Sequence, residues 1–259
     1  MRTLAIRPGA IGDVIVSLPA MECLRGDYLE VWTSGPVVPL IRFADRVRSI
    51  ASTGIDLLGI APPAPDLLAE LGGFGRIFSW YGANRLDFVE LTRALRLPFR
   101  FLRALPPEGC GGHAVDFYLE QVRSLGVACD ALPGEAIPRI DCSGAPGDYA
   151  VIHPFSGSLR KNWPLVKFQR LAMGLQRSMR VAWCAGPEDP PLDGAVHIHD
   201  LYELACWLGR ARLYVGNDSG ITHLAAAAGA PVLALFGPTD PSVWVPRGPN
   251  VRVARWTAR

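Results

Sequence analysis

The sequence contains very little lysine: of its 26 lysine and arginine residues, only Lys161 and Lys167 are lysines. Its formal net charge is +2, and only 19% of its residues are charged. Proteins that bind nucleic acid through the phosphate backbone are usually strongly basic, so this balance argues against a nucleic-acid partner. The hydrophobic content of 49% is instead typical of a folded globular protein.

The motifs of several common protein classes are also missing. The six cysteines show no Cys-x-x-Cys pair or other metal-ligand spacing, so we expect reduced thiols and no metal site; they are Cys23, Cys110, Cys129, Cys142, Cys184 and Cys206. There is no P-loop, and the one loose glycine fingerprint, residues 109–114, follows a proline-containing run instead of a strand. We therefore expect no cofactor and disfavour an NAD-dependent oxidoreductase.

Long hydrophobic runs are scarce as well. Residues 221–237 are apolar, but His223, Gly229 and Pro231 interrupt them, so they predict a helix, a turn and a strand in place of a membrane span. A polar break at residues 12–13 likewise interrupts the apolar stretch near the N-terminus, so no secretory signal is predicted. We therefore expect a cytoplasmic protein.

A group of arginines stands out in the first half; it comprises Arg85, Arg93, Arg96, Arg100 and Arg103. Asp87 and Glu90 offset this charge, so the pattern favours a solvated helix face. It leaves open contact with an anionic acceptor, or peripheral contact with the inner membrane surface.

Short apolar runs alternate with helix-length segments along the chain. The predicted strands are residues 4–6, 29–32, 47–51 and 76–80, then 149–153, 180–184, 196–198, 213–215 and 232–236, with a final strand within 250–256. This alternation predicts an α/β fold with parallel sheets and helices on both faces. Residues 132–147 are rich in Pro and Gly and lack periodicity, which indicates a linker. We therefore predict two Rossmann-like domains, 1–145 and 146–259, that face a shared cleft.

Residues 215–225 carry the most informative pattern, because an apolar run stops at small polar residues and an alanine-rich helix follows. The free N–H groups and positive dipole at the start of a helix favour an anion. Asp218 adds a carboxylate that suits sugar hydroxyls, and His223 lies on the same helix face as Ser219. The stretch predicts a sugar-phosphate site, although Asp218 and Ser219 could instead both serve as helix caps.

Two charged residues sit at similar turns elsewhere. Asp13 follows Gly12 at the start of the first helix, where it could be a general base or simply a helix N-cap. The flexible ammonium group of Lys161 could stabilise the charge that grows on a leaving diphosphate, or Lys161 could be a solvated residue at the start of a helix. Residues 156–158, Ser-Gly-Ser, offer hydroxyls and an open backbone to phosphate, although such residues also fill ordinary loops.

Three blocks of the sequence resemble glycosyltransferase family 9, the ADP-heptose:lipopolysaccharide heptosyltransferases and their relatives. They are residues 7–15 with 18–20, residues 153–158 with 161–164, and residues 215–225 with 231–240. The resemblance implies a GT-B architecture with the acceptor on the N-terminal domain and the nucleotide-sugar donor on the C-terminal domain. It also implies inverting transfer, without a metal, from an ADP-linked sugar such as a heptose to a saccharide or lipid-linked acceptor.

The resemblance also implies roles for single residues. Asp13 matches the general base and Lys161 the group that meets the leaving diphosphate. Matching donor-binding positions are Ser156, Gly157, Ser158, Asp218, Ser219, Gly220 and His223, with Glu188 a looser match to a carboxylate that meets the ribose. Two other functions stay open: a nucleotide-sugar-binding or assembly protein without transferase activity, and a nucleotide-sugar epimerase on the same scaffold.

Overall fold

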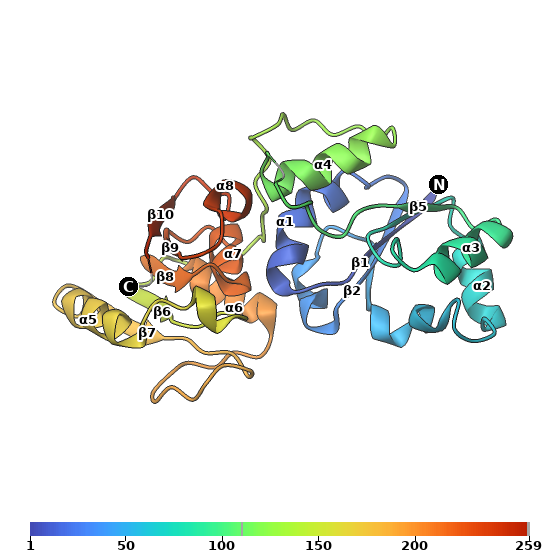
Figure 1. Cartoon of the computed structure of the whole chain (residues 1–259). Coiled ribbons are helices and arrows are strands. Elements are labelled where there is room, and N and C mark those ends of the chain that lie inside the picture. The colour runs from blue at the N-terminus through green and yellow to red at the C-terminus, as the bar shows by residue number, and fades with distance from the viewer. Residues whose placement is uncertain (110, 258–259) are drawn as a thin grey trace.

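The computed structural model describes residues 1–109 and 111–257. It contains two parallel five-stranded sheets, one in each half of the chain (Figure 1). Helices lie between the sheets and beyond them, so the predicted α/β architecture with two Rossmann-like halves is confirmed.

The first sheet has the strand order β3-β2-β1-β4-β5. Its strands are β1 (Arg2–Arg7), β2 (Tyr28–Thr33), β3 (Arg46–Ser49), β4 (Arg76–Ser79) and β5 (Phe99–Phe101). The helices of this half are α1 (Ile11–Glu22), α2 (Pro65–Gly72), α3 (Leu86–Ala94) and α4 (Ala114–Ser124), with 3₁₀ turns η1 (Gly35–Leu40), η2 (Ile50–Ser52) and η3 (Ile55–Leu57). The direction of winding reverses between β1 and β4, and open α/β sheets bind ligands outside such a switch point.

The second sheet has the order β10-β9-β8-β6-β7. Its strands are β6 (Tyr149–His153), β7 (Arg180–Trp183), β8 (Leu213–Asn217), β9 (Val232–Phe236) and β10 (Val251–Arg255). The helices are α5 (Leu165–Leu175), α6 (Leu201–Gly209), α7 (Gly220–Ala227) and α8 (Pro241–Trp244), with the 3₁₀ turn η4 (Leu159–Lys161). Here the switch point falls between β6 and β8, so the turns that follow these two strands are the expected ligand site.

The central strands are buried along almost their whole length, as expected for parallel strands covered on both faces. In β1 every residue after Arg2 is buried, whereas β10 at the sheet edge has no buried residue. One hydrophobic cluster runs from α1 and α4 through to α6 and α7, so the two halves share part of their core. Helices α1 and α7 face each other between the sheets (Figure 1).

Polar contacts also join the halves beside the linker. Arg247 forms a two-pronged ion pair with Asp116 of α4, and His113 Nε2 lies 2.7 Å from the carbonyl oxygen of Val245. Ile140 in the linker donates its backbone N–H to Ala227 O, at 2.9 Å. These contacts hold the two halves together, and the boundary near residue 145 stays a prediction.

Two predicted segments differ from the structure. Residues 196–198 are not a strand: only Val196 pairs, in an isolated bridge with Cys184. Prolines at 187, 190 and 191 and a turn at 193–194 shape the preceding segment, so the chain meets the edge of β7 only at this point. The arginine-rich segment is not one helix either, because Arg96 has a positive φ of 53° that ends the helical path and Arg100 lies in β5.

Residues 221–237 form most of α7, a turn and β9, as predicted. None of the helices in the described part of the chain combines the length and hydropathy that a membrane crossing requires. The five described cysteines carry free thiols; Cys110 lies outside the described residues.

Candidate active site

The turns after β6 and β8 are clamped to each other by one buried side chain. Asn217, the last residue of β8, is fully buried. Its Nδ2 donates to Pro154 O at 2.7 Å, and its Oδ1 accepts from the backbone N–H of Trp163 at 2.9 Å. The amide therefore fixes both ends of the loop 154–163 against the start of α7.

This clamp brings Lys161 to Asp218. The Nζ atom of Lys161 lies 2.8 Å from Asp218 Oδ2, and the hydroxyl of Thr239 donates to the same oxygen at 2.8 Å. The Asp218 side chain is only 6% exposed, whereas that of Lys161 is 33% exposed. The carboxylate is therefore held within the protein while the ammonium group keeps access to solvent.

Ser219, and not Asp218, caps helix α7. Its Oγ accepts from the backbone N–H of Thr222 at 3.3 Å. A cap needs only one such acceptor, so Asp218 is available for Lys161 and Thr239. This arrangement removes the alternative in which both residues serve as caps.

One hydroxyl of the Ser-Gly-Ser turn after β6 already has hydrogen-bond partners within the same loop. Ser156 Oγ lies 2.7 Å from Asn162 Oδ1 and 2.9 Å from Ser158 O, so this hydroxyl shapes the loop. Gly157 is exposed, and a Cβ on it would meet no atom within 4 Å. Packing therefore does not require glycine at residue 157.

His223 lies one turn inside α7 and is buried. Burial lowers the pKa of His223 to about 4; the carboxylate of Asp218 opposes this shift, and His113 and Lys161 reinforce it. The imidazole is therefore neutral at pH 7. It borders the other half of the chain, because a Cβ on Gly12 would lie 3.4 Å from His223 Cδ2.

Asp13 occupies the first turn of α1 but does not cap it. The N-cap position is Ala10, which makes no side-chain cap hydrogen bond. Within residues 1–109 and 111–257, the carboxylate of Asp13 makes no ion pair or side-chain hydrogen bond. The helix-cap alternative therefore does not account for this residue, and the half-buried carboxylate stays available to a ligand.

The N-terminal ends of α1 and α7 touch. A Cβ on Gly220 would lie 2.9 Å from Ile11 Cβ and 3.0 Å from the backbone N of Gly12, so glycine is required there for packing. Two helix N-termini, each with unpaired N–H groups and a partial positive charge, thus meet at one place. The turn of Asp13 and the Lys161–Asp218 pair flank it from opposite halves.

Glu188 does not lie with the charged residues at the junction of α1 and α7. It is exposed in the segment after β7 and makes no hydrogen bond in the described structure. Its neighbour Asp189 is fixed instead, accepting from His153 Nε2 at 2.9 Å and from the backbone N–H of Gly186 at 2.7 Å. Burial would raise the pKa of Asp189, but these hydrogen bonds outweigh it and lower the pKa. Gly186, Pro187, residues 189–195, His197 and His199 line a cavity of about 620 Å³ here.

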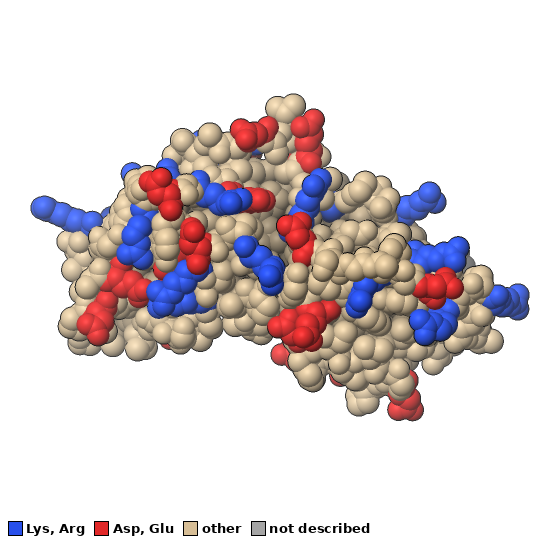
Figure 2. Space-filling model, turned by 180° about the vertical axis from the view of Figure 1, so that it is seen from behind, with Lys and Arg blue, Asp and Glu red and all other residues tan. Residues whose placement is uncertain are grey.

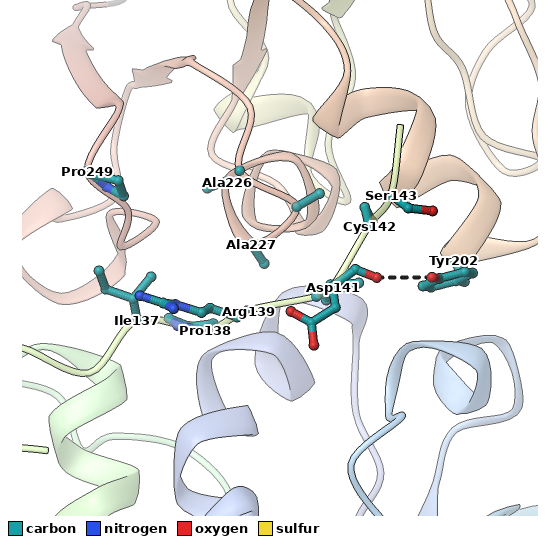
Figure 3. A pocket seen from close by; sticks show the side chains of 13 residues that line it. Ile137, Pro138, Arg139, Asp141, Cys142, Ser143, Tyr202, Ala226, Ala227 and Pro249 are labelled. Atoms are coloured by element: carbon teal, nitrogen blue, oxygen red, sulfur yellow. Dashed lines mark hydrogen bonds between the residues drawn. The ribbon is translucent and has the colours of Figure 1, made fainter. Parts of the chain in front are cut away.

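A second cavity, of about 480 Å³, lies by the linker, away from the predicted site residues (Figure 3). Residues 137–143, Tyr202 and the C-terminal end of α7 line it, and the Tyr202 hydroxyl donates to Asp141 O at 3.0 Å. Because Gly220 begins α7 and residues 226–229 lie at and just beyond its C-terminal end, this cavity is separate from the charged residues at the start of the helix.

The surface charges are mixed. On the face shown in Figure 2, Lys and Arg side chains alternate with Asp and Glu over both halves. Among the described residues, no three His, Cys, Asp or Glu side chains are grouped so that they could hold a metal ion. The charged residues at the junction of α1 and α7 are therefore the strongest candidate for a site in the described structure.

Sequence comparison assigns the chain to a family. The pattern of glycosyltransferase family 9 (heptosyltransferase) matches residues 118–258, more than half of the sequence. The chain belongs to glycosyltransferase family 9. The matched range contains Lys161, Asp218 and His223, whereas Asp13 lies before it.

Named relatives agree with this membership. Lipopolysaccharide heptosyltransferase 3 of Escherichia coli K12 is 30% identical over 189 residues, which cover 66% of this chain and 53% of the relative. Another lipopolysaccharide heptosyltransferase 3 of Escherichia coli is 29% identical, covering 93% of this chain and 84% of the relative. The first alignment thus spans about half the length of its relative.

Solved structures show the same fold. A family 9 glycosyltransferase from Veillonella parvula DSM 2008 has a TM-score of 0.76 at 17% identity, covering 98% of this chain and 86% of that one. The E. coli heptosyltransferase WaaC with ADP has a TM-score of 0.71 at 19% identity, covering 98% and 93%. The predicted GT-B architecture is therefore confirmed for this family member.

Sequence reasoning missed three contributors to the site. Asn217 and Thr239 lie within the recognised blocks, but their sequence positions do not reveal which partners they bind. Arg7 opens the first block and is buried beneath the Asp13 turn. The available signal was an arginine directly after the apolar residues 4–6, because a charged residue at the end of a strand expected to be buried needs a partner.

Proposed function

We propose that this chain transfers a sugar from a nucleotide-diphosphate sugar, with ADP-heptose as the leading candidate, to a saccharide or lipopolysaccharide-type acceptor. Family membership and the names of the relatives support this proposal, as does the structural likeness to WaaC, which has been solved with ADP and with ADP-2-deoxy-2-fluoro heptose. The observation that carries it is the junction of α1 and α7, where Gly12, the neighbour of Asp13, packs against Gly220, two residues after the Asp218 that bonds Lys161.

The diphosphate of the donor would bind at the two helix ends. The N–H groups at the start of α7 and the ammonium of Lys161 supply positive charge for it, and Ser158 and Gly157 leave the backbone after β6 open to phosphate oxygens. Since Lys161 is partly exposed, it can turn from Asp218 toward the diphosphate, which leaves Asp218 free to accept from sugar hydroxyls. Ser219, Gly220 and His223 would border the sugar and phosphates.

The nucleoside would extend across the end of β6 toward β7. The cavity of about 620 Å³ lies beyond β6 in that direction, and the His153–Asp189 hydrogen bond joins it to the end of β6. Glu188 is close in sequence to the lining residues and exposed, so it could turn toward ribose hydroxyls without losing a contact. This assigns the donor to the C-terminal half and the acceptor, saccharide or lipid-linked, to the N-terminal half.

The chemical step would be a single displacement. Asp13 accepts the proton of the acceptor hydroxyl as that oxygen forms a bond to the anomeric carbon, and the bond from this carbon to the diphosphate oxygen breaks. The leaving diphosphate takes the electron pair, while Lys161 and the helix ends stabilise its growing charge without a metal. One displacement inverts the anomeric centre, and a positioned base of this kind contributes about 10²–10⁴ in rate.

Release of ADP from ADP-heptose, measured with and without a lipopolysaccharide acceptor that lacks heptose, tests the proposal. We expect ADP release to depend on the acceptor, and the product to have the inverted anomeric configuration. Donor binding without ADP release would indicate a binding or assembly protein instead. Conversion of the sugar without an acceptor would indicate an epimerase.

A further inference from the structure

Arg7 is a buried cation without an acidic partner. It is the last residue of β1 and only 2% exposed, and no carboxylate of the described residues lies within 4.0 Å of its guanidinium. Burying an unpaired charge is costly, so a guanidinium in such a place is expected to serve a purpose beyond filling space.

The guanidinium holds the Asp13 turn at both ends. One terminal nitrogen donates to Pro8 O at 3.1 Å, and the other donates to the backbone oxygen of Asp13 at 3.0 Å. Its remaining anchors are Ser17 Oγ, at 3.2 Å, and the hydroxyl of Tyr118, at 2.9 Å. The planar fork therefore spans the turn between the strand and the first turn of α1.

The charge of Arg7 also lies near the side chain of Asp13. A Cβ on Gly9 would lie 3.5 Å from Arg7 Nη1 and 3.7 Å from Asp13 Oδ2, so both charged groups flank the same glycine. The guanidinium therefore lies beside the carboxylate of Asp13 and also bonds the backbone of that residue. The nearby Tyr118 hydroxyl donates to Ala104 O, so it is a neutral group here.

The geometry points to Arg7 as the positioning residue for Asp13: it fixes the backbone that carries this carboxylate and places a positive charge beside it. This inference rests on the proposed function, in which Asp13 is the base. Arg7 itself is buried and touches no substrate, so its effect on transfer must pass through Asp13.

A double-mutant cycle tests this role. Arg7→Lys keeps a positive charge but loses the planar fork that bonds Pro8 and Asp13. We expect it to lower kcat by about tenfold or more, with the Kd for ADP within about threefold of the wild-type value. In an Asp13→Asn background we expect the same substitution to change kcat by less than about twofold, because its route of action is already removed.

Arg48→Lys is the matched control, because Arg48 forms a similar fork between Glu30 and Glu70, away from the site. It should lower Tm and leave kcat unchanged. If Arg7→Lys does not fold, Ser17→Ala loosens the same fork and should show the same dependence on Asp13. An equal fall of kcat in both backgrounds would overturn the inference while the proposed function stands, whereas no transfer by the wild-type protein would reject both.

Discussion

The charged residues on the two sides of the junction between α1 and α7 differ in their partners. On the C-terminal side, Lys161 is paired with Asp218, and Thr239 donates to the same oxygen. On the N-terminal side, the Asp13 carboxylate has no ionic partner among the described residues, and the nearby Arg7 bonds only neutral oxygens. A paired residue can exchange its partner for a ligand, whereas the Asp13 carboxylate can meet a ligand without first losing a partner.

The buried carboxylate of Glu30, which lies away from the candidate site, provides a comparison for the carboxylate of Asp13. It is fully buried in β2, and both Arg48 Nε and Trp32 Nε1 donate to its Oε1 at 2.8 Å. Its hydrogen bonds are supplied by the protein, as expected for a carboxylate with a structural role. Asp13 lacks such partners, which is why we assign chemistry to the N-terminal side and donor binding to the C-terminal side.

Asp13→Asn should produce the largest effect. The amide keeps the shape of the side chain but cannot accept the acceptor's proton, so we expect turnover to fall by about 10² or more. The Kd for ADP, measured by calorimetry, should stay within about threefold, because the donor binds on the other side. Unchanged turnover would remove Asp13 from the mechanism and with it the division between the two sides.

The pH dependence of stability should report on His223, where the two sides meet. Its pKa is about 4 in the folded protein and 6.5 in the reference state, so between these values the unfolded chain binds more protons. The stability that comes from keeping His223 neutral is fully present above pH 6.5. As the pH falls toward 4 this stability is lost, and the free energy of unfolding drops by about 3 kcal/mol in all.

Urea denaturation at pH 7 and pH 4.5 measures this dependence. His223→Gln should lose less stability than the wild type between these pH values, and His199→Gln, at an exposed position, should behave as the wild type does. Equal losses in the wild type and His223→Gln would show that this imidazole is not held neutral by burial.

Lys161→Met should weaken ADP binding. A charge-assisted hydrogen bond to phosphate contributes about 1.5–3 kcal/mol, so we expect the Kd for ADP to rise roughly tenfold to a hundredfold. Lys167→Met is the matched control, because Lys167 is the other lysine of the chain and is exposed on α5. The same loss in both variants would show that the effect is one of general charge and not of the Lys161–Asp218 pair.

Gly220→Ala should disturb the junction itself. The added Cβ would approach Ile11 and the Gly12 backbone to about 3 Å, and overpacking of this kind costs about 1–3 kcal/mol. We expect a lower free energy of unfolding and lower turnover, because the helices must separate. Gly157→Ala, where the added atom meets nothing within 4 Å, should leave the free energy of unfolding unchanged.

Alternation of apolar runs with helix-length segments was enough to predict the α/β fold and most of its strands. It failed at residues 196–198, where prolines limit pairing to one bridge, and it missed β5, which is short and contains Arg100. Such edge segments depend on neighbours that are distant in sequence, and local pattern does not specify them.

The site was predicted in part. The polar turns located Asp13, Lys161 and Asp218, because the carboxyl ends of parallel strands gather such turns at one edge. The contact between Lys161 and Asp218, 57 residues apart, follows from the strand order β8-β6, which the sequence pattern does not give. The packing of Gly220 on α1 likewise depends on how the two halves dock.

A crystal structure of the chain with ADP tests the central claim most directly. We predict diphosphate oxygens within hydrogen-bond distance of Lys161 Nζ and of the backbone N–H groups at the start of α7, with the Asp13 carboxylate facing them across the junction. ADP bound in the cavity beside the linker, with the Lys161–Asp218 pair unchanged and the junction empty, would contradict the account.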